Sequence, residues 1–414
     1  MKLDQGGDSE TRFAEYVAGL GSVIGHVERT RPLRDYCTGL MLPGERKSVE
    51  PMAARTAPAR TAAQHQSLLH FVANAAWSDE DVLAKVREMV LPAIEKSGPV
   101  EAWIIDDTSF PKQGKHSVGV HHQYCGQLGK QANCQVAVSL SVANHAASLP
   151  VAYRLYLPEA WTKDRARRKK AGVPKQIKFK TKPQIALEQI REACESGLPR
   201  GVGLMDAAYG RDARLRAGMT ELGVPYVVGI VPTILMWAPG SGPRRMDKPM
   251  NNTGRRDEPE LVSAKKVALG LPKQAWCTVT WREGSADWLS SRFARVRVRV
   301  GYNKLIPEKL SPEWLLISGA NQILALHAAG ERQLHAVHRS GQAALAHRAR
   351  LSGAQAGGRA RSLRRARLAW LPSSRNPVHR GLRLPHRRTG DDSPLRTSFR
   401  RASPGPSLTR QLST

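Results

Sequence analysis

The chain has 414 residues, of which 41% are hydrophobic, and its 64 Lys and Arg against 35 Asp and Glu give a formal charge of +29. This length predicts two or three domains, and the hydrophobic content is sufficient for a buried core. The positive excess points first to nucleic acid, because each neutralised phosphate releases counterions. A merely soluble basic protein is the alternative.

The cysteines and the hydrophobic segments exclude several classes of protein. No Cys-x-x-Cys or Cys/His cluster offers the spacing of a zinc site, so the five scattered cysteines are expected to be reduced thiols. No segment approaches the roughly 20 apolar residues of a membrane span, and the first residues do not resemble a signal peptide. We therefore expect a cytoplasmic protein.

Residues 1–98 are expected to form a helical N-terminal domain. Ser78 marks the clearest helix start, because its side chain can cap the first turn and Asp81 lies three residues further on. Residues 55–66 are interpreted as a polar connector between helices. Such a domain either binds DNA or only packs on the rest of the protein. The apolar residues at helical spacing are Phe13, Tyr16, Val17, Leu20, Val23, Ile24 and Val27.

After residue 98 the hydrophobic period becomes that of strands. Strands in succession, followed by strands that alternate with helices, predict an α/β fold with a mixed sheet. Beyond this sheet, residues 239–260 form a predicted loop rich in Gly, Pro, Asn and Arg. The expected strands are residues 100–105, 136–142, 149–157, 202–205, 226–231, 275–281, 293–300 and 314–317, and the expected helices are residues 183–196 and 211–222.

Two of the predicted strands end in aspartate. Asp106 and Asp107 follow Ile105, and Asp206 follows Met205. A carboxylate at a strand end is fixed in position but open to solvent, as a hard divalent cation requires. If the strands are neighbours, the aspartates can share magnesium for an in-line phosphoryl transfer. The alternative is a pair of aspartates that start turns after strands.

A strongly basic segment lies between these aspartates. Residues 163–182 carry ten basic residues and one acidic residue. Ten cations in one loop repel one another unless they are solvated or lie on phosphate, so a DNA-binding segment is favoured over a solvated loop. Trp161, just before it, either stacks on an extruded base or anchors the loop in the core, and the core role is the commoner.

Several segments, in order, resemble bacterial insertion-sequence transposases of the DDE type, whose catalytic domain has a ribonuclease H-like fold. The similarity spans residues 66–317 and is specific because separate motifs agree. It implies a catalytic domain at residues 99–317 with a β-rich insertion after about residue 232. The segments that carry it are residues 103–112 (WIIDDTSFPK), 114–120 (GKHSVGV), 123–130 (QYCGQLGK), 155–164 (LYLPEAWTKD), 181–187 (TKPQIAL) and 206–210 (DAAYG).

The resemblance assigns roles to individual residues. It places the two catalytic, metal-binding aspartates of the family at Asp107 and Asp206, with Mg²⁺ or Mn²⁺ as cofactor. Asp106 is disfavoured because successive strand residues face opposite ways. The implied partner is double-stranded DNA with terminal inverted repeats, bound by a homo-oligomer associated with the bacterial nucleoid.

Basic residues and histidines lie within and between these sequence motifs. His116, His121 and His122 receive no metal role from the resemblance and are interpreted as surface or DNA-facing residues. The residues expected to contact DNA are Lys112, Lys115, Arg165, Arg167, Arg168, Lys169, Lys170, Lys178, Lys180 and Lys182.

Residues 318–414 depart from the family. They hold 18 Arg, no Lys and three acidic residues, and lack the family's third carboxylate, a glutamate in a pattern like Arg-Trp-x-Ile-Glu. Residues 342–357, translated one base out of frame, are compatible with such a pattern, and Arg348 then stands where the glutamate is expected. We therefore expect a frameshift near residues 317–322 and a disordered tail.

This departure bears on activity. A chain without the third carboxylate is expected to bind DNA weakly but not to cleave it, because one ligand and one negative charge are missing. The alternative to a transposase is a DNA-binding protein without catalysis, either a remnant or an inhibitor of transposition. A ribonuclease H-like RNA-processing nuclease is a third interpretation, which the motif set disfavours.

Overall fold

The computed structural model describes residues 9–43, 47–240, 261–282, 288–301, 312–319 and 323–326. Most of the predicted loop at residues 239–260 lies outside these residues. So does the arginine-rich tail, apart from residues 318–319 and 323–326.

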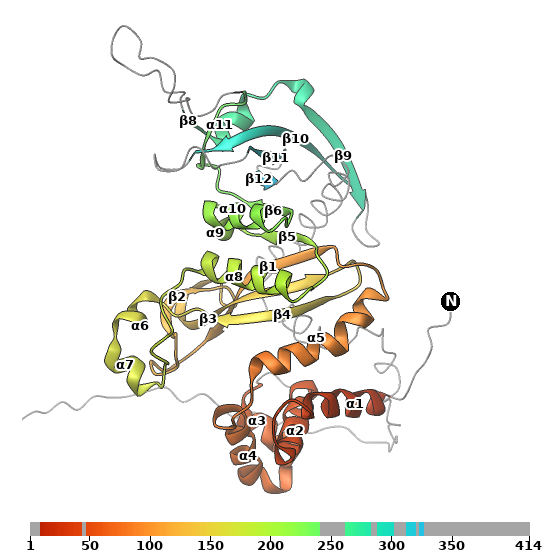
Figure 1. Ribbon diagram of the computed structural model, residues 1–414, viewed down its shortest axis with the longest axis vertical. Coiled ribbons are helices and arrows are strands. Elements are labelled where there is room, and N and C mark those ends of the chain that lie inside the picture. The colour runs from red at the N-terminus through yellow and green to blue at the C-terminus, as the bar shows by residue number, and fades with distance from the viewer. Residues whose placement is uncertain are drawn as a thin grey trace, which may run out of the picture. The chain divides into compact units, whose positions relative to one another are not determined.

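In the described residues before the first strand, the α-helices run from α1 to α5 (Figure 1). α5 begins as predicted, since Ser78 Oγ accepts the amide of Asp81 at 3.1 Å. The predicted connector at residues 55–66 is wrong in part, because α4 already begins at Thr61. Gln64 is buried there, and its Nε2 donates to Asp35 Oδ2 at 2.8 Å. The helices are α1 (Ser9–Gly21), α2 (Thr30–Met41), α3 (Val49–Thr56), α4 (Thr61–Ala73) and α5 (Asp79–Glu95), with 3-10 turns at Val27–Arg29 and Pro58–Arg60.

The central sheet is mixed, as predicted. β1 pairs antiparallel with β3 and parallel with β5, and β5 pairs parallel with β6. Both β2 and β4 pair with β3, which gives the order β4, β3, β1, β5, β6. This is the ribonuclease H-like arrangement expected from the sequence. The strands are β1 (Ala102–Pro111), β2 (His121–Cys125), β3 (Lys130–Ala143), β4 (Ser148–Leu155), β5 (Val202–Met205) and β6 (Tyr226–Gly229).

Between these strands lie α6 (Glu159–Lys163), α7 (Arg165–Lys170), α8 (Lys182–Glu195), α9 (Ala207–Gly210) and α10 (Ala213–Glu221). α8 begins where Thr181 and Gln184 form a reciprocal capping box. Its buried Ile185 and Ile190 share one hydrophobic core with Trp103 of β1. None of the described helices has the length and hydrophobicity that a membrane span requires.

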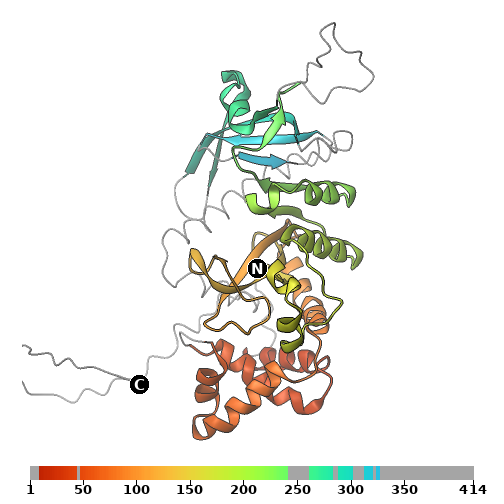
Figure 2. The same ribbon diagram turned by 90° about the vertical axis from the view of Figure 1, so that its left-hand side faces the viewer.

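The sheet continues beyond β6 (Figure 2). β12 pairs antiparallel with both β6 and β11, and β11 pairs with β10. Three predicted strands are confirmed in β9, β10 and β11. The elements are β7 (Leu235–Trp237), β8 (Leu261–Ser263), α11 (Ala264–Leu269), a 3-10 turn at Lys273–Ala275, β9 (Trp276–Arg282), β10 (Trp288–Val300), β11 (Glu313–Ser318) and β12 (Ile323–Leu326).

The first aspartate does not end a strand. β1 continues to Pro111, because the long β3 pairs with it along its whole length, with Asp107 opposite Val138 and Pro111 opposite Cys134. The predicted end at residue 105 is therefore wrong. β5, in contrast, ends at Met205 as predicted, so that Asp206 directly follows it.

Candidate active site

Asp107 lies inside β1, and both of its carboxylate oxygens have partners. Oδ1 accepts a hydrogen bond of 2.5 Å from the Tyr209 hydroxyl. Oδ2 is 2.5 Å from Nζ of Lys182, the first residue of α8. The Asp107 side chain is 30% exposed and that of Lys182 28%, so this ion pair remains open to solvent.

Asp206 begins the turn after β5, the strand next to β1. Its Oδ1 accepts the amides of Ala208 at 2.8 Å and Tyr209 at 3.3 Å, which caps the four-residue helix α9. The same helix supplies the Tyr209 hydroxyl that contacts Asp107. One short turn therefore links both predicted aspartates.

The Tyr209 hydroxyl lies in a concentration of negative charge. Burial raises the pKa of Tyr209, Asp107 raises it further by its charge and its hydrogen bond, and the carboxylates of Asp106 and Asp206 add smaller effects in the same direction. Asp106 is exposed, and its Oδ1 accepts the amide of Asp107 at 2.7 Å. Three carboxylates thus act on one phenol.

The donor set suits a hard divalent cation. Carboxylate oxygens are the ligands that magnesium prefers, and Asp107 already holds one cation, the Lys182 ammonium. In the described part of the chain, no group of three or more His, Cys, Asp or Glu is arranged to hold a metal ion. A metal site built on Asp107 of β1 and Asp206 after β5 would therefore need further oxygen donors.

Two of the predicted DNA-binding arginines make contacts within the chain. Arg167 donates to the carbonyl of Lys115 at 2.6 Å, and its guanidinium lies 3.8 Å from the ring centroid of Trp161. Arg168 donates to two carbonyls within its own loop, those of Pro174 and Ile177.

Trp161 is fully buried, and its Nε1 donates to the Val120 carbonyl at 2.8 Å. The structure thus gives Trp161 the core role that the sequence favoured.

The other predicted DNA-binding residues divide into two groups. Lys180 pairs with Glu188 at 2.7 Å, and Lys182 pairs with Asp107. The second group is exposed on and around α7. The three predicted surface histidines are also exposed, and none of them lies among the contacts of Asp107 that the structure gives. The exposed basic residues are Lys112, Lys115, Arg165, Lys169, Lys170 and Lys178.

Sequence reasoning missed a buried charged cluster behind the site. Glu313 of β11 accepts from Arg216 Nε of α10 at 2.7 Å and from the Tyr226 hydroxyl of β6 at 2.5 Å. Arg216 Nη1 also donates to the carbonyl of Gly210, at the end of α9. These three residues are at most 6% exposed. No local pattern could have found the pair, because 97 residues separate Arg216 from Glu313.

Gly210 fixes the same turn by close packing. A Cβ at this position would lie 1.9 Å from the carbonyl oxygen of Gly229 in β6. The turn that carries Asp206 is therefore held at its far end by Arg216 and by contact with β6.

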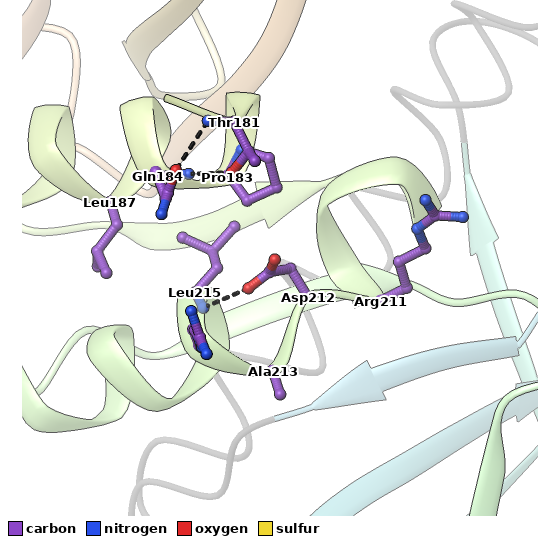
Figure 3. A pocket seen from close by; sticks show the side chains of 9 residues that line it. Thr181, Pro183, Gln184, Leu187, Arg211, Asp212, Ala213 and Leu215 are labelled. Atoms are coloured by element: carbon purple, nitrogen blue, oxygen red, sulfur yellow. Dashed lines mark hydrogen bonds between the residues drawn. The ribbon is translucent and has the colours of Figure 1, made fainter. Parts of the chain in front are cut away.

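A cavity of about 330 Å³ lies between the starts of α8 and α10 (Figure 3). Thr181 and Gln184 line it from α8, and residues 211–215 line it from the other side. Asp212 Oδ1 accepts the amide of Leu215 at 2.9 Å and so caps α10, as Thr181 caps α8. Neither predicted aspartate lines this cavity.

Comparison with known proteins agrees with the motifs and the fold. Residues 19–287 match the model of the DDE superfamily endonuclease family. Over 166 residues the chain is 30% identical to the "Probable transposase for insertion sequence element IS701" of Microchaete diplosiphon. This match covers 40% of the chain and 40% of that protein, so the chain spans less than half of the curated relative. Because the family match covers more than half of its length, the chain belongs to the DDE superfamily endonucleases.

Proposed function

We propose that the chain derives from a transposase that cuts and joins DNA at the ends of an insertion sequence, with Asp107 and Asp206 as metal-binding catalytic residues. The observation that carries this proposal is the convergence of two aspartates, from neighbouring parallel strands, on the single turn Asp206–Gly210. Their oxygens would hold Mg²⁺ or Mn²⁺, which when bound would activate the attacking oxygen and stabilise the leaving one.

The chain's own residues would bind and orient the DNA. The exposed cations around α7 would neutralise phosphates of double-stranded DNA, and Arg167 would hold this segment against Trp161. Tyr209 would fix the Asp107 carboxylate in one orientation. The proposed DNA partner carries terminal inverted repeats, and a homo-oligomer would bring two ends together.

A second proposal concerns activity. The sequence after residue 317 contains no counterpart of the family's glutamate helix, and Arg348 stands in its expected place. Two carboxylates hold two cations less tightly than three, and an arginine would repel them. The chain as sequenced would then bind terminal-repeat DNA without cutting it, as a remnant or as an inhibitor of transposition.

One experiment tests both proposals. Three proteins are incubated with labelled terminal-repeat DNA and Mn²⁺: the chain as sequenced, a chain that continues after residue 317 in the adjacent reading frame, and the latter with Asp107→Ala. We expect all three to bind DNA and only the second to nick it. If the second protein is inactive, the transposase proposal fails. If the chain as sequenced nicks efficiently, the proposed loss of activity fails.

A further inference from the structure

Lys182 differs from the other cations of the basic segment in what it contacts. Arg167 and Arg168 donate to backbone carbonyls, and Lys180 pairs with Glu188. Lys182 instead places its ammonium 2.5 Å from Oδ2 of Asp107, an oxygen that the proposed function assigns to a divalent cation.

This contact is open enough to be exchanged. Both side chains remain more than a quarter exposed, so neither charge has been fully removed from water. The Lys182 ammonium also lies 5.4 Å from the ring centroid of Tyr156, a weaker contact that a moving side chain can give up. The backbone of Lys182 is fixed by the capping box of α8, whereas its side chain has four rotatable bonds.

Two cations cannot share Asp107 Oδ2 without cost. A divalent ion coordinated to that oxygen would lie close to the ammonium, and the two like charges would repel each other. Any divalent ion that binds Asp107 must therefore displace Lys182 or tolerate its charge.

Resting on the proposed function, we infer that Lys182 occupies the place of a divalent cation on Asp107 and thereby couples metal binding to DNA binding. Without DNA, its ammonium occupies Asp107 and competes with the divalent ion. When DNA lies on the exposed cations of the same basic segment, Lys169, Lys170 and Lys178, the ammonium transfers to a backbone phosphate, for which lysine is a suitable point charge. Asp107 is then free for the metal, so DNA and metal bind cooperatively.

Competition of this kind has an unusual consequence for metal affinity. If Lys182 only oriented Asp107, its removal would weaken metal binding. A competing cation has the opposite effect, so Lys182→Met is expected to tighten Mn²⁺ binding in the absence of DNA by about threefold to tenfold. Lys182→Arg keeps the charge and should leave the affinity near that of the unmodified chain.

The test measures Mn²⁺ binding by electron paramagnetic resonance of the full chain, with no DNA cleavage involved. Lys180→Met is the matched control, because it removes a lysine two residues away that pairs with Glu188 rather than Asp107. Asp107→Ala defines the site-specific part of the signal. Circular dichroism establishes that each variant is folded.

A second arm adds a short DNA duplex, with the Asp107→Ala variant and the same duplex as the reference for Mn²⁺ held by DNA alone. DNA should tighten Asp107-dependent binding in the unmodified chain and have a smaller effect in Lys182→Met.

Weaker or unchanged Mn²⁺ affinity in Lys182→Met, with binding still dependent on Asp107, would overturn the inference alone. Absence of Asp107-dependent binding in every variant would overturn the assignment of Asp107 as a metal ligand, and this inference with it, whereas descent from a transposase is tested separately by the nicking experiment.

Discussion

Two ion pairs flank the turn that carries Asp206, and they differ in exposure. Asp107 and Lys182 are about 30% exposed, whereas Arg216 and Glu313 are 3% and 8% exposed as side chains. The exposed pair consists of two single charges joined by one short contact. The buried pair is bidentate, and it makes further hydrogen bonds with the Tyr226 hydroxyl and the Gly210 carbonyl.

The difference separates a contact that can exchange partners from one that cannot. Water and ions can replace either member of an exposed pair, so such a pair contributes little to stability. A buried charge has no such replacement, and removal of its partner leaves it uncompensated in a poorly solvated site. The exposed pair is therefore suited to ligand exchange, and the buried pair to holding α9 in place.

The largest expected effect comes from breaking the buried pair. Glu313→Ala leaves the Arg216 guanidinium buried without its carboxylate, and should lower the free energy of unfolding by about 3–5 kcal/mol. Urea denaturation measures this. Lys182→Met breaks the exposed pair but leaves the Tyr209 hydrogen bond to Asp107, and should cost about 0–1 kcal/mol. Equal losses in the two variants would remove the distinction between the pairs.

The close packing of Gly210 gives the next effect. In Gly210→Ala, the new methyl group would overlap the Gly229 carbonyl oxygen, so that α9 or β6 must shift. The expected cost is about 1–3 kcal/mol in thermal or urea unfolding. Gly114→Ala is the matched control, because a Cβ at that position would meet nothing within 4 Å. Gly172 is unsuitable as a control, because its φ of +68° would strain any other residue. An unchanged stability of Gly210→Ala would show that the turn is not held by this contact.

The buried pair should also make the free energy of unfolding depend on pH in the alkaline range. Burial, followed by the charge of Glu313, raises the pKa of Tyr226 above its ordinary value of 10.0. The folded chain therefore keeps a proton that the unfolded chain loses above pH 10. The contribution of this proton to the free energy of unfolding is complete below pH 10. It decreases as the pH rises above 10, by up to about 1.4 kcal/mol per pH unit.

Urea titrations between pH 9 and pH 11 should show a shallower decline in Tyr226→Phe, although this variant is less stable at neutral pH. Parallel declines in the two proteins would contradict the assignment.

The smallest effects concern DNA binding at the exposed cations of α7. Replacing Lys169 or Lys170 with Ala should weaken binding for all DNA sequences and reduce the slope of log affinity against log salt by about one. Fluorescence anisotropy over a range of salt concentrations measures both. Arg168→Ala, which removes loop contacts rather than an exposed cation, should loosen the loop instead, detected as faster proteolysis within residues 163–182.

The sequence was sufficient for the parts of the fold that depend on local patterns. Alternating apolar residues located β3, and the hydroxyl of Ser78 located the start of α5. The end of β1 was not predictable locally, because its polar residues 106–109 remain in the strand only through pairing with β3.

The candidate site shows the same division. Asp107 and Asp206 could be identified from their positions after apolar runs and from family motifs. The partners of Asp107, which are Tyr209 and Lys182, come from 102 and 75 residues further along the chain, so their contacts depend on tertiary structure. The same holds for Arg216 and Glu313.

The position of β12 has a consequence for how the chain tolerates a change of reading frame. β12 begins at residue 323, just after the predicted frameshift, and its main chain pairs with β6 on one side and β11 on the other. Pairing of this kind uses amide and carbonyl groups that every residue except proline supplies. Many different amino-acid sequences encoded here could therefore pair as a strand between β6 and β11. A chain that stopped at Ser318 would instead leave the edges of β6 and β11 unpaired and prone to self-association.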